Sequence, residues 1–406
     1  MADKMDLLDV EVWDGNMAAS QAFRQAQIDV VAAYPITPST PVVENYAGFL
    51  ADGYVDGEYV MVESEHAAMS GCVGAAAAGG RVATATSSQG FALMVEVLYQ
   101  ASGMRLPIVL EVVNRALAAP LNVNGDHSDM YLGRDSGWIQ LDTFSPQEAY
   151  DLTLMAFKIG EDHNVRLPVM VHQDGFISSH TAQGVKTIDD DTAYNFLGEF
   201  QPFNAMLDFE KPASYGVQTE EDWHFEHKAR QHNDLMTKVF PKIDEVFADF
   251  KKLTGREYRI LEEYAMDDAE VAIVVMGTSV ESTRIVCAEL REQGIKAGVL
   301  GIRVLRPFPM EKIAAALSGV KAVATLDRSS PNGTVGMLFN EMSGVMINAT
   351  ERPIINNYIY GLGGRDLTIE HIRGIYGDLQ ENAKAGSLQQ PLQQFIGLRG
   401  PKLSFY

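Results

Sequence analysis

Residues 65–115 read EHAAMSGCVGAAAAGGRVATATSSQGFALMVEVLYQASGMRLPIVLEVVNR, in which two helical patterns are each followed by an apolar, β-branched run. The small-residue pattern over 65–80 ends in two glycines, which favour a helix terminus. A second helix is expected over 91–104, and the runs 81–88 and 106–115 have the composition of buried strands. Helices that alternate with strands are typical of a doubly wound parallel sheet, so we expect an α/β fold.

The same alternation continues on both sides of this stretch. IDVVAAYPIT (28–37) and LPVMVHQDG (167–175) are two further expected strands. In sheets of this kind, ligands bind beyond the carboxyl ends of the strands. Four polar residues fall at these ends, namely Thr37, Ser88, Arg115 and Asp174. This edge of the sheet is therefore the expected ligand site.

Composition divides the chain into three parts. Residues 1–190 hold the first α/β unit. Residues 191–262 are rich in aromatic and charged side chains and predict a linking arm with a long helix from about Glu220 to Lys252. Residues 263–406 begin a second α/β unit, with strands in EVAIVVMGT, KAGVLGIRVLRPFP and AVATLDRS, and the tail after about Gly361 is expected to be an irregular arm.

Charge and cysteine content exclude several classes of protein. The chain has 32 basic and 54 acidic residues, a formal charge of -22, and such a surface repels nucleic acid and anionic lipid. Only Cys72 and Cys287 are present, without the spacing that iron–sulfur clusters or zinc require. The sequence shows neither a signal peptide nor a long apolar stretch. We therefore expect a cytoplasmic protein with no nucleic acid or membrane partner.

Glu65 stands at the start of the small-residue helix, in VESEHAAMSGCVGAAAAGG. A carboxylate at a helix start usually stabilises the helix terminus, because it faces the positive end of the macrodipole. Here the segment lies between YPITPST (34–40) and TSSQG (86–90), each of which ends an expected strand. The three segments together indicate a binding site in which Glu65 takes part.

Several motifs, in this order along the chain, resemble the alpha subunits of the 2-oxoacid:acceptor oxidoreductases, the pyruvate:ferredoxin oxidoreductase family. The motifs are YPITPST, VESEHAA, TSSQG, GMRLPIV with VNRALAAP, GDHSDMYLGRDSGWIQ and LPVMVHQDGF. MGTSVESTR and VLRPFP resemble the second domain of that family, which is similar to the transketolase C-terminal domain. The resemblance covers nearly the whole chain. It implies a thiamine diphosphate domain of the pyrimidine-binding type followed by a transketolase C-terminal-like domain.

The resemblance also implies roles for three residues. Glu65 would hydrogen-bond the aminopyrimidine ring of thiamine diphosphate and favour the imino tautomer that takes the thiazolium proton. Thr37 would lie beside the thiazolium and the substrate, although a turn hydroxyl that bonds its own backbone is the alternative. Arg115 would bind the substrate carboxylate through its planar guanidinium. The alternative for Arg115 is a structural ion pair with Glu111.

Other polar residues near these motifs are assigned smaller roles. Ser88 and Gln89 are further candidates for cofactor binding, and Asn114 and Asn124 are candidates for substrate binding. We expect His66 to make local contacts only. The polar loop 126–129, which includes His127, is expected to shape the pocket or a subunit contact rather than to bind a metal.

Missing motifs indicate what partner chains must supply. The chain lacks a GDG segment followed by Asn, a cysteine cluster, a P-loop and a dinucleotide fingerprint. No metal site is therefore expected on this chain. The resemblance implies that Mg²⁺, the other half of the thiamine diphosphate site and 4Fe-4S clusters lie on beta, gamma and ferredoxin-like delta subunits, with FAD on a flavin subunit where the complex reduces NAD. The 2-oxoacid and CoA would be its small-molecule partners.

The substrate is inferred from two departures from the pyruvate type. The loop LNVNGDHSD has Asn124 where pyruvate-type relatives commonly carry Trp, and the arm has PASYG (212–216) in place of P-x-T-x-G. The arm is also rich in aromatic residues, namely Phe196, Phe200, Phe203, Phe209, Tyr215, Trp223 and Phe225. The chain as a whole most resembles the phenylglyoxylate dehydrogenase variety of the family, which makes benzoyl-CoA. The alternatives are a pyruvate oxidoreductase that makes acetyl-CoA, whose aromatics seal a subunit interface, and a non-catalytic assembly subunit.

Overall fold

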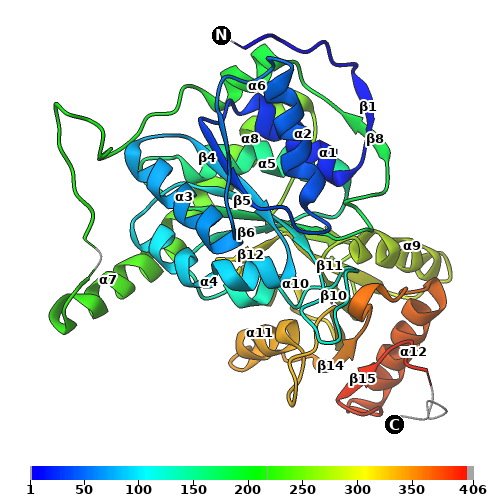
Figure 1. Cartoon of the computed structure of the whole chain (residues 1–406). Helices are drawn as coiled ribbons and strands as arrows, with labels where there is room; N and C mark the ends of the chain where they lie inside the picture. Colours follow the sequence, from blue (N-terminus) through cyan, green and yellow to red (C-terminus); the bar gives the residue numbers. More distant parts are fainter. Residues whose placement is uncertain (1, 217, 400–406) are drawn as a thin grey trace.

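The computed structural model describes residues 2–216 and 218–399. Two sheets, each covered by helices, lie one below the other in Figure 1, with the first part of the chain around the upper sheet and the last part around the lower one. The α/β class with parallel sheets, expected from the alternation of helices and strands, is confirmed. None of the helices in the described ranges is both long and apolar enough to cross a membrane.

The first sheet has seven strands in the order β12-β6-β7-β5-β4-β2-β3. All its neighbours pair in parallel except β12 with β6. A separate antiparallel pair joins β1 (Val10–Trp13) to β8 (Gln183–Lys186). The strands from the first part of the chain are β2 (Val30–Ala33), β3 (Glu58–Met61), β4 (Val82–Thr86), β5 (Val109–Asn114), β6 (Ile139–Asp142) and β7 (Val169–Asp174).

Helices cover both faces of this sheet, which explains why its central strands are apolar without alternation. On one face, Val109 and Val169 pack in the same core as Phe157 of α5. On the other face, Leu110 packs with Phe91 of α4. The helices are α1 (Gly15–Gln25), α2 (Thr40–Ala51), α3 (Glu65–Ala78), α4 (Ser88–Gly103), the 3-10 turn η1 (Met130–Gly133) and α5 (Pro146–Gly160).

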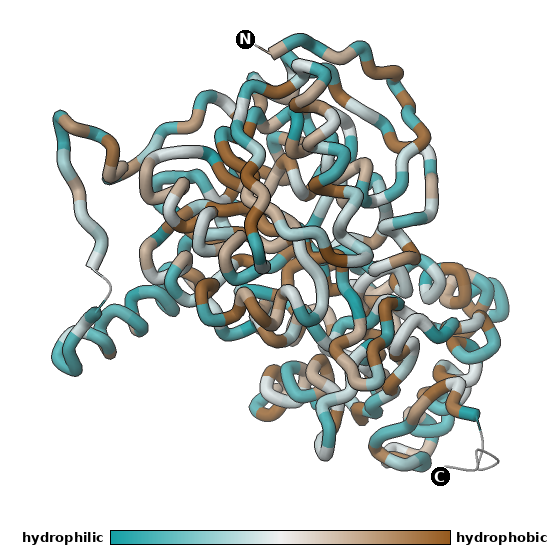
Figure 2. Tube along the Cα trace, viewed as in Figure 1, coloured by the Kyte–Doolittle hydropathy of each residue, from teal (hydrophilic) through white to brown (hydrophobic). Residues whose placement is uncertain are grey.

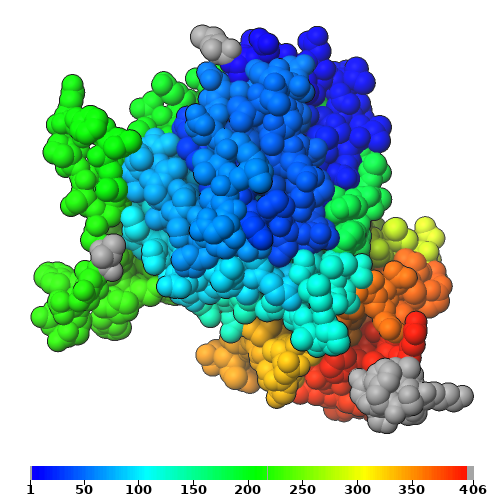
Figure 3. All heavy atoms as spheres, viewed as in Figure 1, coloured from blue at the N-terminus to red at the C-terminus, as the bar shows by residue number. Residues whose placement is uncertain are grey.

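The linking segment begins with α6 (Asp190–Leu197) and ends in a long helical stretch, as expected. This stretch consists of α7 (Glu221–Asp234), the π-helical turn η2 (Leu235–Val239) and α8 (Phe240–Thr254). α8 buries Ile243 and Phe250 in the core. By contrast, α7 is strongly hydrophilic (Figure 2) and projects from the body together with residues 199–216 (Figure 3).

The second sheet has six strands in the order β15-β14-β13-β10-β11-β9. Only β9 is antiparallel to its neighbour. The strands are β9 (Leu261–Tyr264), β10 (Val271–Val275), β11 (Ala297–Ile302), β13 (Ala322–Asp327), β14 (Ile354–Ile359) and β15 (Gln393–Phe395). The helices are α9 (Ser279–Glu292), α10 (Met310–Ala316), α11 (Met337–Met346), the 3-10 turn η3 (Leu362–Gly364) and α12 (Ile369–Ala385).

The expectation of an irregular arm after Gly361 is wrong for most of that segment. α12 starts at a capping box formed by Thr368 and His371 and is followed by β15, which pairs in parallel with β14. The helix buries side chains at a spacing of three and four residues, which is the pattern of an amphipathic helix: Ile372, Ile375, Tyr376 and Leu379. Residues 400–406 of the expected arm lie outside the described residues.

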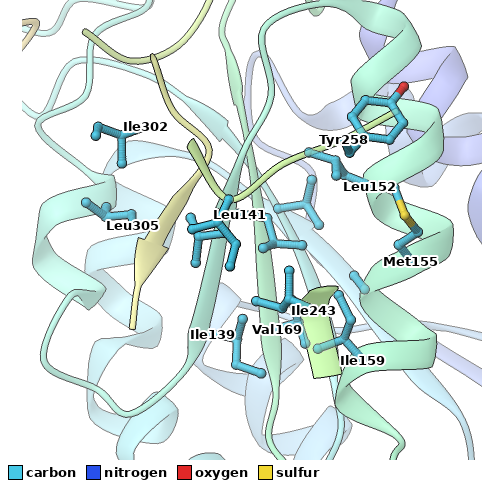
Figure 4. Packing of buried hydrophobic residues seen from close by; sticks show 14 of the residues in the cluster. Ile139, Leu141, Leu152, Met155, Ile159, Val169, Ile243, Tyr258, Ile302 and Leu305 are labelled. Carbon is cyan, nitrogen blue, oxygen red and sulfur yellow. The ribbon is translucent and has the colours of Figure 1, made fainter. Parts of the chain in front are cut away.

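The last part of the chain contributes one strand to the first sheet, and the two sheets share a core. After β11, the chain crosses to the first sheet, where β12 (Val304–Arg306) pairs antiparallel with β6. Figure 4 shows Leu141 of the first sheet packed in one cluster with Ile302 and Leu305. Arg303, between those two residues, is buried and forms ion pairs with Glu148 and Glu262. The segment expected as one strand and a turn is therefore two strands in two sheets.

Candidate functional site

Three of the loops singled out in the sequence meet at the carboxyl edge of the first sheet. β7, β5, β4 and β2 are neighbours in that order, so the residues that follow them converge. The guanidinium of Arg115 donates from Nη1 to the carbonyl of Thr37 and from Nη2 to Oε1 of Gln89, each at 2.6 Å. Arg115 therefore joins the ends of three strands.

Glu65 lies in the first turn of α3, but it does not cap the helix. The cap is Ser64, whose Oγ accepts a hydrogen bond from the backbone N–H of Ala67. Glu65 is 7% exposed, and its carboxylate lies against Gly90, where a Cβ would come within 2.5 Å of Oε1. Within the described residues it makes no hydrogen bond or ion pair. A buried carboxylate without a partner suits a ligand that offers an N–H group.

Arg115 does not form the structural ion pair considered as its alternative role. Glu111 lies within the sheet and accepts a hydrogen bond from Thr153, and burial raises the pKa of Glu111 to about 8. Arg115 is 5% exposed, and its Nε has no hydrogen-bond partner in the described part of the chain. Burial lowers the pKa of Arg115, while Asp129 and Glu65 oppose that shift. The guanidinium bonds only neutral oxygens and can therefore accept an anionic ligand.

Thr37 and Gln89 are exposed beside this guanidinium. Across the described residues, the hydroxyl of Thr37 makes no hydrogen bond, so it does not act as the turn hydroxyl of its own backbone. The loop that carries Thr37 is fixed by a hydrogen bond from α1, in which Asn16 donates from Nδ2 to the carbonyl of Pro38 at 2.8 Å. The Ser88 hydroxyl is buried, 2.6 Å from both Gln89 Oε1 and the Ala116 carbonyl.

Asp129 organises this edge of the sheet, and it was not singled out in the sequence as a site residue. Its carboxylate accepts four hydrogen bonds at 2.8 to 2.9 Å, from the backbone N–H groups of Ser88, Arg115 and Met130 and from Nδ2 of Asn114. These bonds tie the ends of β4 and β5 to the loop before η1. Burial raises the pKa of Asp129 to about 6, although the surrounding N–H donors favour the ionised form. Asp129 is therefore a positioning residue for Arg115.

We expect Asp129→Asn to raise KM for the anionic ligand expected at Arg115 by roughly tenfold while kcat changes less. An amide leaves two of the four N–H donors unpaired, and each buried unpaired donor costs about 1 to 3 kcal/mol, enough to displace Arg115. In the unmodified protein, KM should also rise as the pH falls below about 6, when Asp129 gains a proton. The variant should lack that dependence.

The control for this prediction is Asp126→Asn in the same loop. Asp126 accepts hydrogen bonds from the backbone N–H groups of Ser128 and Gly363, and in the described part of the chain it bonds neither Arg115 nor Ser88. Steady-state kinetics between about pH 5.5 and 8 give both quantities. Equal changes in KM for the two variants, with the same pH profile, would show that Asp129 only stabilises the loop.

The two asparagines expected at the substrate are tied to other groups. Asn114 is buried and its amide bonds Asp129, while its Oδ1 lacks a partner within the described residues. Asn124 is exposed, and its side chain packs against Gly364 of the second unit, where a Cβ would come within 2.5 Å of the Asn124 Cβ. Asn124 makes no hydrogen bond to Arg115, Thr37 or Glu65 in the described chain.

The two histidines near these motifs, His66 and His127, have local partners. His66 lies at the surface with Nε2 3.6 Å from a carboxylate oxygen of Glu96. His127 is buried with Nε2 2.7 Å from Asp174, which also pairs with Arg328 at 2.8 Å. Burial would raise the pKa of Asp174, but Arg328 and His127 hold it well below its usual range. Asp174, at the end of β7, therefore links the two sheets.

Over residues 2–216 and 218–399, no group of three or more His, Cys, Asp or Glu is placed to hold a metal.

Comparisons with known proteins match most of the chain. The family described as "Pyruvate flavodoxin/ferredoxin oxidoreductase, thiamine diP-bdg" matches residues 21–245, and "Pyruvate:ferredoxin oxidoreductase core domain II" matches residues 269–372. The chain is 46% identical to pyruvate synthase subunit PorA of Thermotoga maritima, over 95% of this chain and 97% of that protein. It is 41% identical to ketoisovalerate oxidoreductase subunit VorA of Pyrococcus abyssi, over 95% and 97%.

A solved structure shares the fold. The 2-oxoglutarate:ferredoxin oxidoreductase from Magnetococcus marinus, determined with 2-oxoglutarate, coenzyme A and succinyl-CoA bound, superposes with a TM-score of 0.68. The alignment covers 94% of this chain and 67% of that one, at 22% identity. The likeness extends over both sheets, so it concerns the arrangement of the whole chain.

Proposed function

Because the chain belongs to the pyruvate flavodoxin/ferredoxin oxidoreductase family, we propose that it is the alpha subunit of a CoA-acylating 2-oxoacid oxidoreductase with pyruvate as substrate. The reaction would convert the 2-oxoacid to an acyl-CoA and CO2 and pass two electrons to partner subunits. The observation that carries this proposal is that Glu65, a buried residue whose carboxylate makes no hydrogen bond in the described chain, lies at the same sheet edge as the buried guanidinium of Arg115, whose Nε has no hydrogen-bond partner there.

The site residues fit thiamine diphosphate and a 2-oxoacid. When bound, thiamine diphosphate supplies the carbon nucleophile and the electron sink for loss of CO2. Glu65 would hold a proton shared with the aminopyrimidine ring, and Arg115 would bind the substrate carboxylate. Thr37, with a free exposed hydroxyl, would stabilise the negative charge that develops on the keto oxygen. Ser88 and Gln89 would hold Arg115 and the cofactor ring in place.

The remainder of the machinery is proposed to lie on partner chains of the same complex. The relatives PorA and VorA are named as subunits of larger enzymes. The described part of this chain holds no metal cluster. Partner subunits would therefore supply Mg²⁺, the diphosphate half of the cofactor site and the 4Fe-4S clusters, in the cytoplasm.

Pyruvate replaces phenylglyoxylate as our proposed substrate. The relatives above are named for pyruvate and ketoisovalerate, and they give no support to an aromatic 2-oxoacid. The aromatic residues of the linking segment lie in three places. Phe196 packs on Phe250 in the core, Phe203 lies over the guanidinium of Arg166, and Phe209, Trp223 and Phe225 are exposed on the projecting arm and α7. None of these places is the edge of the sheet that holds Arg115, which weakens the argument for a wide aromatic pocket.

A substrate panel on the purified complex tests this proposal. We expect kcat/KM to be largest for pyruvate, smaller for 2-oxoisovalerate and smallest for phenylglyoxylate. Reduction of the electron acceptor and formation of the acyl-CoA should be measured together, since both are required by the reaction. A larger kcat/KM for phenylglyoxylate than for pyruvate would overturn the choice of substrate.

The same panel on Asn124→Trp examines whether this loop filters substrates by size. A filter would depress activity on phenylglyoxylate much more than on pyruvate, because the ring would occupy space. Equal losses on both substrates would exclude the loop as a filter. The contact of Asn124 with Gly364 would then explain the loss by packing alone.

A further inference from the structure

A second pocket lies at the opposite edge of the first sheet. Arg105 follows α4 and precedes β5, and residues 163–166 precede β7, so both stand at the amino ends of strands whose carboxyl ends carry the Arg115 site. The cavity has a volume of about 330 Å³ and is also lined by residues of the arm, α7 and η2. It is therefore separate from the site proposed for catalysis.

The pocket is positively charged, although the whole chain carries a formal charge of -22. Its lining includes four cationic side chains and one acidic one: Arg105, Arg166, Arg230, Lys238 and Asp234. Asp234 forms ion pairs with three of these cations. The nitrogen–oxygen distance is 2.7 Å to Arg105 and 3.0 Å to Arg230 and Lys238. The acidic residues next to the pocket are also paired, Glu161 with Arg81 and Asp162 with Lys242.

Arg166 is the cation without a carboxylate partner. Arg166 is only 9% exposed, and its Nε has no hydrogen-bond partner within the described chain. Its two Nη atoms reach the carbonyls of Gln201 and Phe203 at 3.4 Å, near the limit of a hydrogen bond. The ring of Phe203 lies 5.5 Å from the guanidinium and covers one face. Burial lowers the pKa of Arg166, while Tyr215 and Glu161 oppose that shift.

We propose that this pocket binds the phosphate group of a small molecule. Four cations against one carboxylate leave an excess positive charge that matches a doubly charged phosphate better than a single carboxylate. A guanidinium with a free Nε presents the paired donors that phosphate oxygens accept. The volume is at the lower end of small-molecule sites, roughly 300 to 1,000 Å³, and suits a compact ligand. His163, Asn164 and Tyr215 would form the rim.

Calorimetric titration of the purified complex with inorganic phosphate tests the proposal. The complex is first saturated with thiamine diphosphate and Mg²⁺, and ionic strength is held constant. We expect one phosphate per alpha subunit, with acetate bound at least about tenfold more weakly because its charge is smaller. Repeating the titration with CoA present identifies the source of the phosphate. Loss of the signal assigns it to a phosphate of CoA, and retention assigns it to a free phosphate compound.

Two variants and a control make the result specific to this pocket. Arg166→Gln should weaken phosphate binding by roughly thirtyfold or more, since it removes a buried charge that faces the anion. Lys238→Gln, with a partly exposed side chain, should weaken it less and leave folding intact. The control is Arg284→Gln, whose arginine pairs with Glu281 on the surface of α9. Phosphate affinity unchanged in both pocket variants, or acetate bound as tightly as phosphate, would overturn the proposal.

Discussion

Glu65→Gln is expected to lower turnover of the complex by roughly two to four orders of magnitude, the usual effect of losing a proton-transfer group. Glutamine has nearly the same size as glutamate and fits the same space against Gly90, so the fold around residue 65 should persist. In the role proposed for Glu65 the carboxylate shares a proton with the aminopyrimidine ring, which an amide cannot do, so only the chemical step should suffer. Thiamine diphosphate content should therefore change little. Turnover and bound cofactor, measured on the same preparation, give both quantities.

Ser64→Ala is the matched control for Glu65→Gln. It removes the cap of α3, which should cost about 1 kcal/mol of stability, and it leaves the carboxylate of Glu65 in place. We expect this variant to melt at a lower temperature with nearly normal turnover. If Glu65→Gln behaves in the same way, Glu65 serves the helix alone, and the chain is then better described as a non-catalytic assembly subunit.

Arg115→Lys is expected to lower kcat/KM about a hundredfold, and by the same factor for pyruvate and for 2-oxoisovalerate. Lysine keeps the charge but lacks the planar guanidinium. In Arg115 the two Nη atoms bond the Thr37 carbonyl and Gln89, which leaves Nε free for the proposed substrate carboxylate. Two hydrogen bonds to a charged group contribute about 3 kcal/mol, which corresponds to that factor. Every 2-oxoacid carries the same carboxylate, so the loss should not depend on its side chain. Steady-state kinetics with both substrates measure it.

Arg284→Lys supplies a surface control in which both charge and exposure are retained. It should leave kcat/KM within about twofold, since substitutions at exposed pairs contribute little. A loss in Arg115→Lys that is confined to one substrate would place Arg115 at the variable end of the 2-oxoacid. Normal kinetics in that variant would remove Arg115 from substrate binding.

The carboxyl edge could be anticipated from the sequence because it follows from the order of strands. Thr37, Gln89 and Arg115 each come directly after a recognisable strand, and parallel neighbours bring such residues together. Asp129 could not be found in this way, since it lies in a loop without periodicity and its four bonds are tertiary. α12 was missed for a different reason. Its helical spacing and its Thr368 cap are present in the sequence, so the signal existed.

The substrate was the least predictable feature. The inference from Asn124 and the arm assumed that these residues lie near the substrate. In the structure, Asn124 packs on Gly364 and Phe209 is almost fully exposed. The composition of a segment gives its residue types but not their positions. The distance of these aromatic residues from Arg115 depends on the direction in which the arm projects from the rest of the protein.

The crossing of β12 limits how this protein can be divided. A shortened chain ending near residue 262 would retain every helix of the first sheet, yet it would leave the outer backbone of β6 without its partner. It would also expose the apolar side chains that Ile302 and Leu305 cover. An uncovered strand edge beside an apolar surface recruits other chains. The two halves of the gene product are therefore not interchangeable modules, and exchanging the second half between relatives requires that its β12 match the β6 edge of the first half that receives it.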